Sequence, residues 1–293
     1  MGGSLCSVPR KKWGYTCEDV HKMVLAPQLA SGNLILIGGG EQKDRPGAIL
    51  REVARRAKGP DGKLVLVTAA TQVPMAYLDM YLPLFGDLGV TNVDVLDIRT
   101  RDDGHDEVGL RKLHDASVVF FTGGNQLRIS SQMGGTPAAA AIRRVYESGG
   151  TVAGTSAGAT VMSGTMLTGG VGREDPDAGS IEMAPGLGLF EEAIVDSHFG
   201  QRGRIGRLMA AVAQNPSKIG LGIDEDTAIV VDRGGEFRVM GTGAVYVVDG
   251  SGITHSSLKA RDSRGKMSLH NVRLHVLRSG ERFDMPGRCP LPA

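Results

Sequence analysis

The first half of the chain alternates between short apolar runs and longer segments whose apolar residues recur at helical spacing. The apolar runs lie at 32–40, 63–71, 90–98 and 117–125, and the helical patterns at 46–58, 75–88 and 137–150. Strands that are buried on both faces of a parallel sheet have continuous apolar sequences. Strands that alternate with helices form βαβ units, whose helices cover both faces of the sheet. The pattern therefore predicts an α/β fold with a mostly parallel central sheet flanked by helices.

The second half has a different pattern, in which strand-like segments follow one another through short links. These segments are AIVDSHF, IGLGIDEDTAIVVD, EFRVMG, AVYVVDG and NVRLHVLRSG. Short links join antiparallel neighbours, so we expect added, partly antiparallel strands that extend the same sheet. No linker or repeat divides the chain. We therefore predict an N-terminal extension over 1–31 and a single α/β domain over 32–293.

Composition narrows the possible functions. The chain has 33 Lys and Arg against 32 Asp and Glu, and this net charge of +1 argues against a broad nucleic-acid surface. It has no apolar run of the roughly 18 residues that a membrane span needs, and its N-terminus lacks the apolar core of a secretory signal. We therefore expect a cytoplasmic protein without membrane contact. Cys6, Cys17 and Cys289 form no CxxC pair, which argues against a disulfide framework and cysteine-bound zinc.

Glycine is overrepresented, with 43 residues in 293, roughly double the average share of about 7%. Many glycines follow apolar runs, where they permit tight turns and bring the backbone close to a ligand. The sharpest case is Gly154-Thr155-Ser156-Ala157-Gly158, which matches G-x-S-x-G between a predicted strand and a predicted helix. This context favours Ser156 as a nucleophile, although a small-residue turn could produce the same pattern.

A serine nucleophile needs a base, and the base needs a carboxylate to orient it. Among seven histidines, His198 follows an apolar strand, and the carboxyl ends of strands in such sheets collect functional groups. It is either the base or a histidine bonded to backbone. Asp224, Glu225 and Asp226 are candidates for the carboxylate, and the residues alone do not choose among them.

An oxyanion hole needs two backbone N–H groups that point at one place. Ala157, directly after the serine, supplies one of them. The segment FTGGNQ ends a neighbouring strand, and Gly124 within it is the candidate for the second.

Four motifs in this order, FTGGNQLRI, GTSAGA, DSHFGQRGRIGRL and GIDEDTA, resemble the cyanophycinases. These are serine peptidases of the class I glutamine amidotransferase-like fold, and the resemblance covers roughly residues 32–250. It implies a Ser-His-Glu triad that falls on Ser156, His198 and Glu225, which selects one of the three acids. It also implies that the enzyme needs no metal or organic cofactor and forms a homodimer.

The resemblance further implies a substrate, cyanophycin, which is polyaspartate with an arginine in amide linkage on each side chain. Its cleavage along the aspartate backbone, through an acyl-enzyme, releases β-aspartyl-arginine. Side chains of complementary chemistry lie near the motif residues. Amides and an acid could meet the substrate's donors, and guanidinium groups suit its carboxylates. These candidates are Asn125, Gln126, Asp196, Arg202, Arg204 and Arg207. The acidic, glycine-rich segment 169–183 is either a loop over the pocket or a solvated surface loop.

Known members of the family carry glutamine where this chain has Ser197, so contacts with the substrate are expected to differ there. Three alternatives stay open. One is an aspartyl dipeptidase of the same fold. Another is an α/β-hydrolase esterase, with Asp196 or a neighbour as acid and His255, His270 or His275 as base. The third is a catalytically silent binding module.

Overall fold

The computed structural model describes residues 32–43, 47–57, 62–169, 181–257 and 267–292. The predicted N-terminal extension, 1–31, lies outside these ranges. The strands are β1 (Asn33–Ile37), β2 (Leu64–Val67), β3 (Val93–Leu96), β4 (Val118–Phe121), β5 (Thr151–Thr155), β6 (Thr165–Gly169), β7 (Glu182–Pro185), β8 (Ala193–Asp196), β9 (Ile219–Ile223), β10 (Thr227–Val231), β11 (Glu236–Gly241), β12 (Ala244–Asp249), β13 (His255–Ser256), β14 (Leu269–His270), β15 (Arg273–Arg278), β16 (Arg282–Asp284) and β17 (Cys289–Leu291). The helices are α2 (Ala48–Arg56), α3 (Pro74–Asp87), α4 (Glu107–Leu113), α5 (Gln126–Met133), α6 (Pro137–Glu147), α7 (Ala157–Thr160) and α8 (Ile205–Gln214), with 3-10 turns η1 (Asp102–His105) and η2 (Gly200–Arg202).

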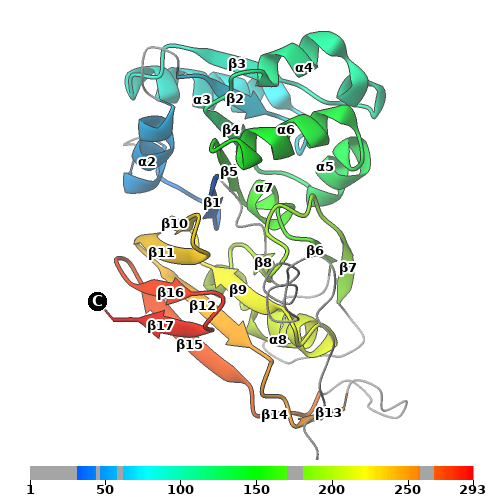
Figure 1. Ribbon diagram of the computed structural model, residues 1–293, viewed down its shortest axis with the longest axis vertical. Coiled ribbons are helices and arrows are strands. Elements are labelled where there is room, and N and C mark those ends of the chain that lie inside the picture. The colour runs from blue at the N-terminus through cyan, green and yellow to red at the C-terminus, as the bar shows by residue number, and fades with distance from the viewer. Residues whose placement is uncertain (1–31, 44–46, 58–61, 170–180, 258–266, 293) are drawn as a thin grey trace, which may run out of the picture.

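The largest sheet has nine strands in the order β17-β16-β11-β10-β1-β5-β4-β2-β3. The segment from β1 to β3 is parallel throughout, and β10, β11, β16 and β17 add to it in antiparallel fashion. Because the parallel strands run in one direction, the loops after β1, β4 and β5 all emerge at the same edge (Figure 1). This arrangement confirms the predicted class, a mostly parallel sheet with added antiparallel strands.

Two apolar cores cover the faces of this sheet, because successive side chains of a strand point to opposite sides. In β1, Leu34 and Leu36 join one core and Ile35 and Ile37 join the other. The first core also contains apolar residues of α5 and α6, and the second contains those of α2 and α3. The buried strands are therefore apolar on both faces, which explains their continuous apolar sequences.

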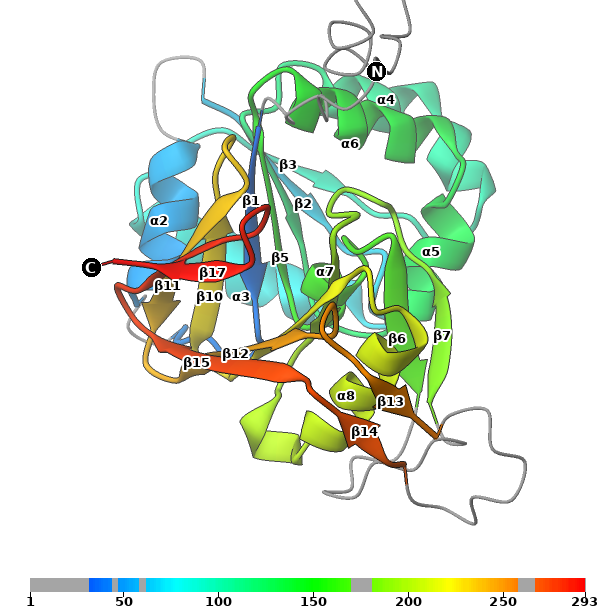
Figure 2. The same cartoon turned by 60° about the horizontal axis from the view of Figure 1, so that its bottom comes forward.

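The expectation that every later strand extends the central sheet is wrong. A second sheet of four strands, in the order β15-β12-β9-β8, packs beside β10 and β11 (Figure 2). The segment IGLGIDEDTAIVVD contains two strands rather than one. It contributes β9 to the second sheet and β10 to the first, and residues 224–226 form the crossing. Both strands are apolar, so the pattern gave no sign of the break between sheets.

Helix α8 covers the outer face of the second sheet. Leu208 and Val212 of this helix pack with Ile194 of β8 and Val248 of β12. Strands β6 and β7 form a separate antiparallel pair, as do β13 and β14. Most of the acidic segment predicted over 169–183 lies outside the described residues.

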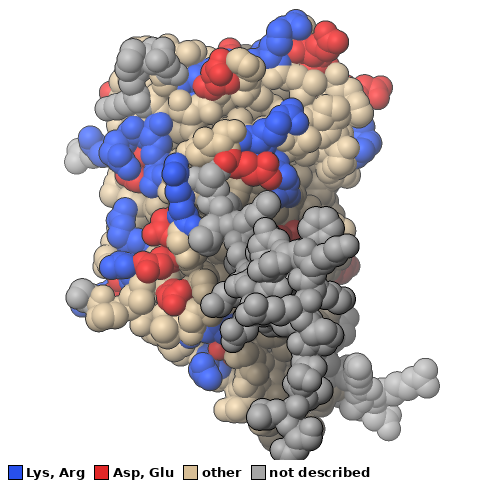
Figure 3. Space-filling view, in the orientation of Figure 1, with Lys and Arg blue, Asp and Glu red and all other residues tan. Residues whose placement is uncertain are grey.

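Basic and acidic side chains are interspersed on the molecular face shown in Figure 3. This distribution agrees with a net charge of +1. No helix among the described residues has the length and apolar character needed to cross a membrane.

Candidate active site

Ser156 stands at a sharp turn between β5 and α7, with φ of 54° and ψ of −111°. A positive φ is uncommon for a residue other than glycine and is kept only where neighbours hold it. Here the Ser156 N–H donates to the carbonyl of Ile37 at 2.9 Å. The flanking glycines let the turn close, because a Cβ on Gly154 would lie 2.5 Å from the carbonyl of Gly158. The motif thus presents the serine at the carboxyl edge of the sheet.

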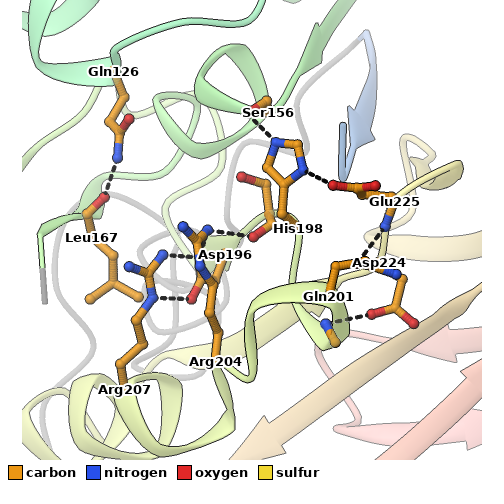
Figure 4. Close-up of polar contacts among 12 residues, drawn as sticks. Gln126, Ser156, Leu167, Asp196, His198, Gln201, Arg204, Arg207, Asp224 and Glu225 are labelled. Carbon is orange, nitrogen blue, oxygen red and sulfur yellow. Dashed lines mark hydrogen bonds and ion pairs between the residues drawn. The ribbon is translucent and has the colours of Figure 1, made fainter. Parts of the chain in front are cut away.

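Three side chains form a hydrogen-bonded line at this edge (Figure 4). Ser156 Oγ lies 2.8 Å from Nε2 of His198, and Nδ1 of His198 lies 2.6 Å from Oε1 of Glu225. A carboxylate only accepts, so it favours the tautomer with the proton on Nδ1 and leaves Nε2 free to accept from the serine. The imidazole is 14% exposed and the glutamate side chain 41%. Such a line can activate a serine as a nucleophile.

The three neighbouring acids have separate partners. Only Glu225 contacts the histidine. Asp224 is buried and accepts from the backbone N–H groups of Gly200 and Ala244 at 2.8 and 3.0 Å. Asp226 accepts from the Gln42 N–H and the Thr242 hydroxyl. The sequence alone could not show which of the three acids contacts the histidine, because the crossing between the two sheets points each acid in a different direction.

The loop after β1, Gly38-Gly39-Gly40, supports the histidine and was not recognised from the sequence as part of the site. The carbonyl of Gly38 accepts from the His198 N–H at 2.7 Å. Gly39 has φ of 95°, and a Cβ there would lie 2.3 Å from Cε1 of the His198 ring. The sequence did contain a signal for this loop. Three consecutive glycines follow the buried strand, as two glycines follow β4 in the loop that was assigned to the site.

A further residue that sequence reasoning missed is Gln201 in η2. Its side-chain oxygen accepts from the backbone N–H of Glu225 at 3.0 Å (Figure 4). This contact ties the segment that follows His198 to the segment that carries the carboxylate.

Gly124 lies in the loop after β4 and Ala157 is the first residue of α7, directly after the serine. A Cβ built on Gly123 would be 3.6 Å from the Cβ of Ser156, so the loop after β4 passes directly beside the serine. Within the described ranges, the N–H groups of Gly124 and Ala157 have no acceptor. Donors without an internal partner are what an oxyanion hole requires.

Asp196, at the end of β8, is 1% exposed and already has two cationic partners (Figure 4). Arg207 binds both carboxylate oxygens, with Nε 2.6 Å from Oδ2, and Nη1 of Arg204 lies 3.1 Å from Oδ1. Arg204 also donates to the carbonyl of Ser197 at 2.5 Å. Burial lowers the pKa of Arg204 to about 10 and Asp196 opposes this shift, so the guanidinium stays charged at neutral pH.

The other predicted binding residues have different surroundings. Asn125 caps α5 through the Leu127 N–H, and Gln126 donates to the carbonyl of Leu167 at 2.8 Å. Ser197 is buried beside His198. Arg202 is exposed in η2, and its guanidinium has no hydrogen bond or ion pair to a described residue.

The histidines of the esterase alternative do not contact the serine. The rings of His255 and His270 contact each other in a tilted arrangement with centroids 4.8 Å apart, and His275 packs against Phe283. In the portion of the chain covered by the structure, no three His, Cys, Asp or Glu side chains are grouped to hold a metal ion.

The parallel sheet and the serine–histidine–glutamate line at its carboxyl edge define the class of α/β serine hydrolases. Comparison with known proteins gives the family. The profile described as "Peptidase family S51" matches residues 34–240. A cyanophycinase from Trichormus variabilis is 39% identical over 268 residues, which is 91% of this chain and 90% of that protein. A cyanophycinase from Geminocystis herdmanii is 35% identical over 265 residues, covering 90% of this chain and 97% of that protein.

The chain therefore belongs to peptidase family S51 and is a serine-type peptidase. This confirms the resemblance given by the four motifs. A crystal structure of a peptidase from an acI-B1 Actinobacterium has the same fold, with a TM-score of 0.64 at 22% identity. The match covers 88% of this chain and 98% of that one.

We predict that Gly39→Ala lowers the hydrolytic rate about a hundredfold, because the new methyl group displaces the His198 ring. Gly86→Ala is the matched control, since a Cβ at this helical glycine meets nothing within 4 Å. The control should keep its activity and gain up to about 1 kcal/mol in the free energy of unfolding. Steady-state rates and urea unfolding of both variants test this. Full activity of Gly39→Ala would show that the ring does not depend on the loop.

We also predict opposite effects for two adjacent acids. Glu225→Gln should lower kcat by roughly 10⁴-fold, as removal of an orienting carboxylate does, with little change in stability at this half-exposed position. Asp224→Asn should instead lower the free energy of unfolding by about 1–3 kcal/mol, because two backbone N–H groups lose a charged acceptor. Kinetics and denaturation of the two variants separate the roles. The assignment fails if Asp224→Asn is inactive at normal stability while Glu225→Gln is fully active.

Proposed function

We propose that this protein degrades cyanophycin, cutting the aspartate backbone and releasing β-aspartyl-arginine. The observation that carries the proposal is the line from Ser156 through His198 to Glu225 at the edge of a fold shared with S51 peptidases. The extent of the match supports the substrate, because relatives described as cyanophycinases are 35–39% identical over about 90% of the chain.

In the proposed mechanism, Ser156 Oγ attacks a backbone carbonyl while His198 Nε2 takes its proton. The carbonyl oxygen becomes negative and accepts from the N–H groups of Gly124 and Ala157. His198 then gives the proton to the departing amine, which leaves an acyl-serine. A water molecule attacks the acyl group, His198 takes the water's proton, and this proton returns to the serine as the acid product leaves. Glu225 keeps the imidazole in the required tautomer and stabilises its charged form.

For substrate recognition, we assign direct and indirect roles according to exposure. Arg202 is exposed and has an unoccupied guanidinium, which suits the α-carboxylate of a substrate arginine. Asp196 is buried between two arginines, so we assign it the orientation of Arg204 and Arg207 in place of direct contact with substrate. The amides of Asn125 and Gln126 remain candidates for substrate contacts, although each side chain has an internal partner. Ser197 is shorter than the family's glutamine, so we expect a different contact with substrate at this position.

A homodimer and a cytoplasmic location also belong to the proposal. The dimer rests on the resemblance to cyanophycinases, and the location rests on sequence composition. No nucleic-acid or membrane partner is proposed.

We predict that the wild-type protein converts purified cyanophycin to β-aspartyl-arginine, whereas folded Ser156→Ala has a rate reduced about a millionfold. The reason is that alanine cannot form the acyl intermediate. Chromatography of the products, with Asp-Leu as a second substrate, distinguishes polymer hydrolysis from the dipeptidase alternative. The proposal is wrong if Asp-Leu is cleaved and cyanophycin is not. Turnover by Ser156→Ala close to that of the wild type would exclude the serine as nucleophile.

We predict that the arginines near the histidine differ in effect. Arg202→Ala should raise KM for cyanophycin about tenfold to a hundredfold without changing stability, because it removes one charged contact with substrate. Arg207→Ala should lower the free energy of unfolding by about 3–5 kcal/mol, because it removes a partner of a buried carboxylate. Kinetics on cyanophycin and chemical denaturation test both effects. An unchanged KM in Arg202→Ala would remove this residue from the recognition site.

A further inference from the structure

A buried carboxylate outside the serine–histidine–glutamate line contacts the residue next to the nucleophile. Glu41 follows the glycine loop after β1, and its side chain is 1% exposed. Its Oε2 accepts from the hydroxyl of Thr155 at 2.7 Å, and its Oε1 accepts from the hydroxyl of Tyr81 at 2.5 Å. The ammonium group of Lys43 lies 3.3 Å from Oε1. Burial of a carboxylate is costly unless hydrogen bonds and an opposite charge compensate it, and Glu41 has both in this network.

The network connects three segments that carry or support the site. Thr155 is the last residue of β5 and directly precedes Ser156, whose backbone has the strained φ of 54°. Glu41 directly follows Gly40, and a Cβ on Gly40 would lie 3.0 Å from Oε2 of Glu225. The same carboxylate therefore links the nucleophile turn to the loop that borders the histidine and its acid.

The third segment is helix α3, whose Tyr81 donates to Glu41 from outside the two loops. The Tyr81 ring lies 5.2 Å from that of Phe120 and 6.0 Å from that of Phe85, measured between centroids. Burial and the charge of Glu41 raise the pKa of Tyr81, so its phenol stays protonated and continues to donate. Because these rings are packed in the core, the tyrosine hydroxyl is a fixed point for the carboxylate.

We propose that Glu41 is a positioning residue for the peptidase reaction, which acts through Thr155 to hold Ser156 Oγ in line with His198. The χ1 torsion of Thr155 alone sets the position of its hydroxyl, and the hydrogen bond to the carboxylate holds that torsion in one rotamer. The hydrogen bond therefore restrains the last residue before the strained turn. Displacement of a reacting atom by about 1 Å can cost roughly a hundredfold in rate, so loss of this restraint slows attack without removing any catalytic group. The inference rests on Ser156 as the nucleophile and does not depend on the identity of the substrate.

The test is the rate at which a fluorophosphonate labels Ser156, measured by intact mass well below the thermal midpoint of each variant. Thr155→Val and Glu41→Gln should label about ten to a hundred times more slowly than the wild type. Thr155→Ser, which keeps the hydroxyl, should label within about threefold of the wild type. On any substrate that the enzyme cleaves, the two slow variants should lower kcat and leave KM within about twofold.

The matched control is Thr68→Val, which removes another hydrogen bond from a buried threonine to a carboxylate, at 2.7 Å to the exposed Asp97. Thr68 follows β2, which β4 separates from the serine strand, so this variant should lose stability and keep the wild-type labelling rate. If Thr155→Val does not fold, the labelling rate of Glu41→Gln alone tests the proposal, because glutamine has the same size as glutamate.

Three results would overturn the proposal. These are wild-type labelling by Glu41→Gln, equal slowing in Thr155→Ser and Thr155→Val, and equal slowing in Thr68→Val. A different failure identifies an error in the proposed function itself. A wild-type protein that labels at Ser156 but does not cleave cyanophycin has a different substrate, and one that never labels at Ser156 has a different nucleophile.

Discussion

The hydrogen bond between Ser156 and His198 joins two sheets, and the geometry of the candidate active site depends on it. The serine follows β5 of the nine-stranded sheet, and the histidine follows β8 of the four-stranded sheet. A separation of 2.8 Å between their side chains therefore requires the two sheets to pack in one relative position. The shared apolar core between them supplies this rigidity, with Ile229 and Val239 on one side and Leu221 and Val247 on the other.

The backbone at the junction reflects the same constraint. Ser156, His198 and Asp226 all have positive φ although none is glycine. Residues other than glycine keep a positive φ only where the surrounding structure holds them, and they cluster at functional sites. Here backbone hydrogen bonds to the end of β1 and the loop after it hold these residues, since the carbonyls of Ile37, Gly38 and Gly39 accept from their N–H groups in turn. The end of β1 and its glycine loop are thus the common support of Ser156, His198 and the segment that carries Glu225.

The sequence was sufficient for the features that depend on local pattern. Continuous apolar runs predicted the parallel strands, and G-x-S-x-G between a strand and a helix predicted the serine turn. It was insufficient where chain segments from different sheets meet. Both β9 and β10 are apolar, so no local signal showed that residues 224–226 cross from one sheet to the other. Because that crossing directs each acid separately, Asp224, Glu225 and Asp226 were indistinguishable until the resemblance was used.

The partners of the buried ionic groups also could not be predicted from local sequence. Asp196 was predicted to face substrate because it lies two residues before the histidine. Its partners are Arg204, directly before α8, and Arg207 within α8, and only the packing of α8 brings them to the carboxylate. Glu41 is a lone acid after glycines, and its donors Tyr81 and Thr155 are distant from it in sequence. Long-range pairing of this kind leaves no periodic pattern in a single sequence.

The central claim is that His198 activates Ser156 across the junction between the sheets. It is tested most directly by mapping the site of covalent labelling with a fluorophosphonate in the wild type and in His198→Gln. Peptide mass spectrometry should place the adduct on Ser156 in the wild type and find labelling slowed by at least a thousandfold in the variant, since the serine then lacks its base. An adduct on a different residue, or equal labelling of Ser156 in His198→Gln, would contradict this account.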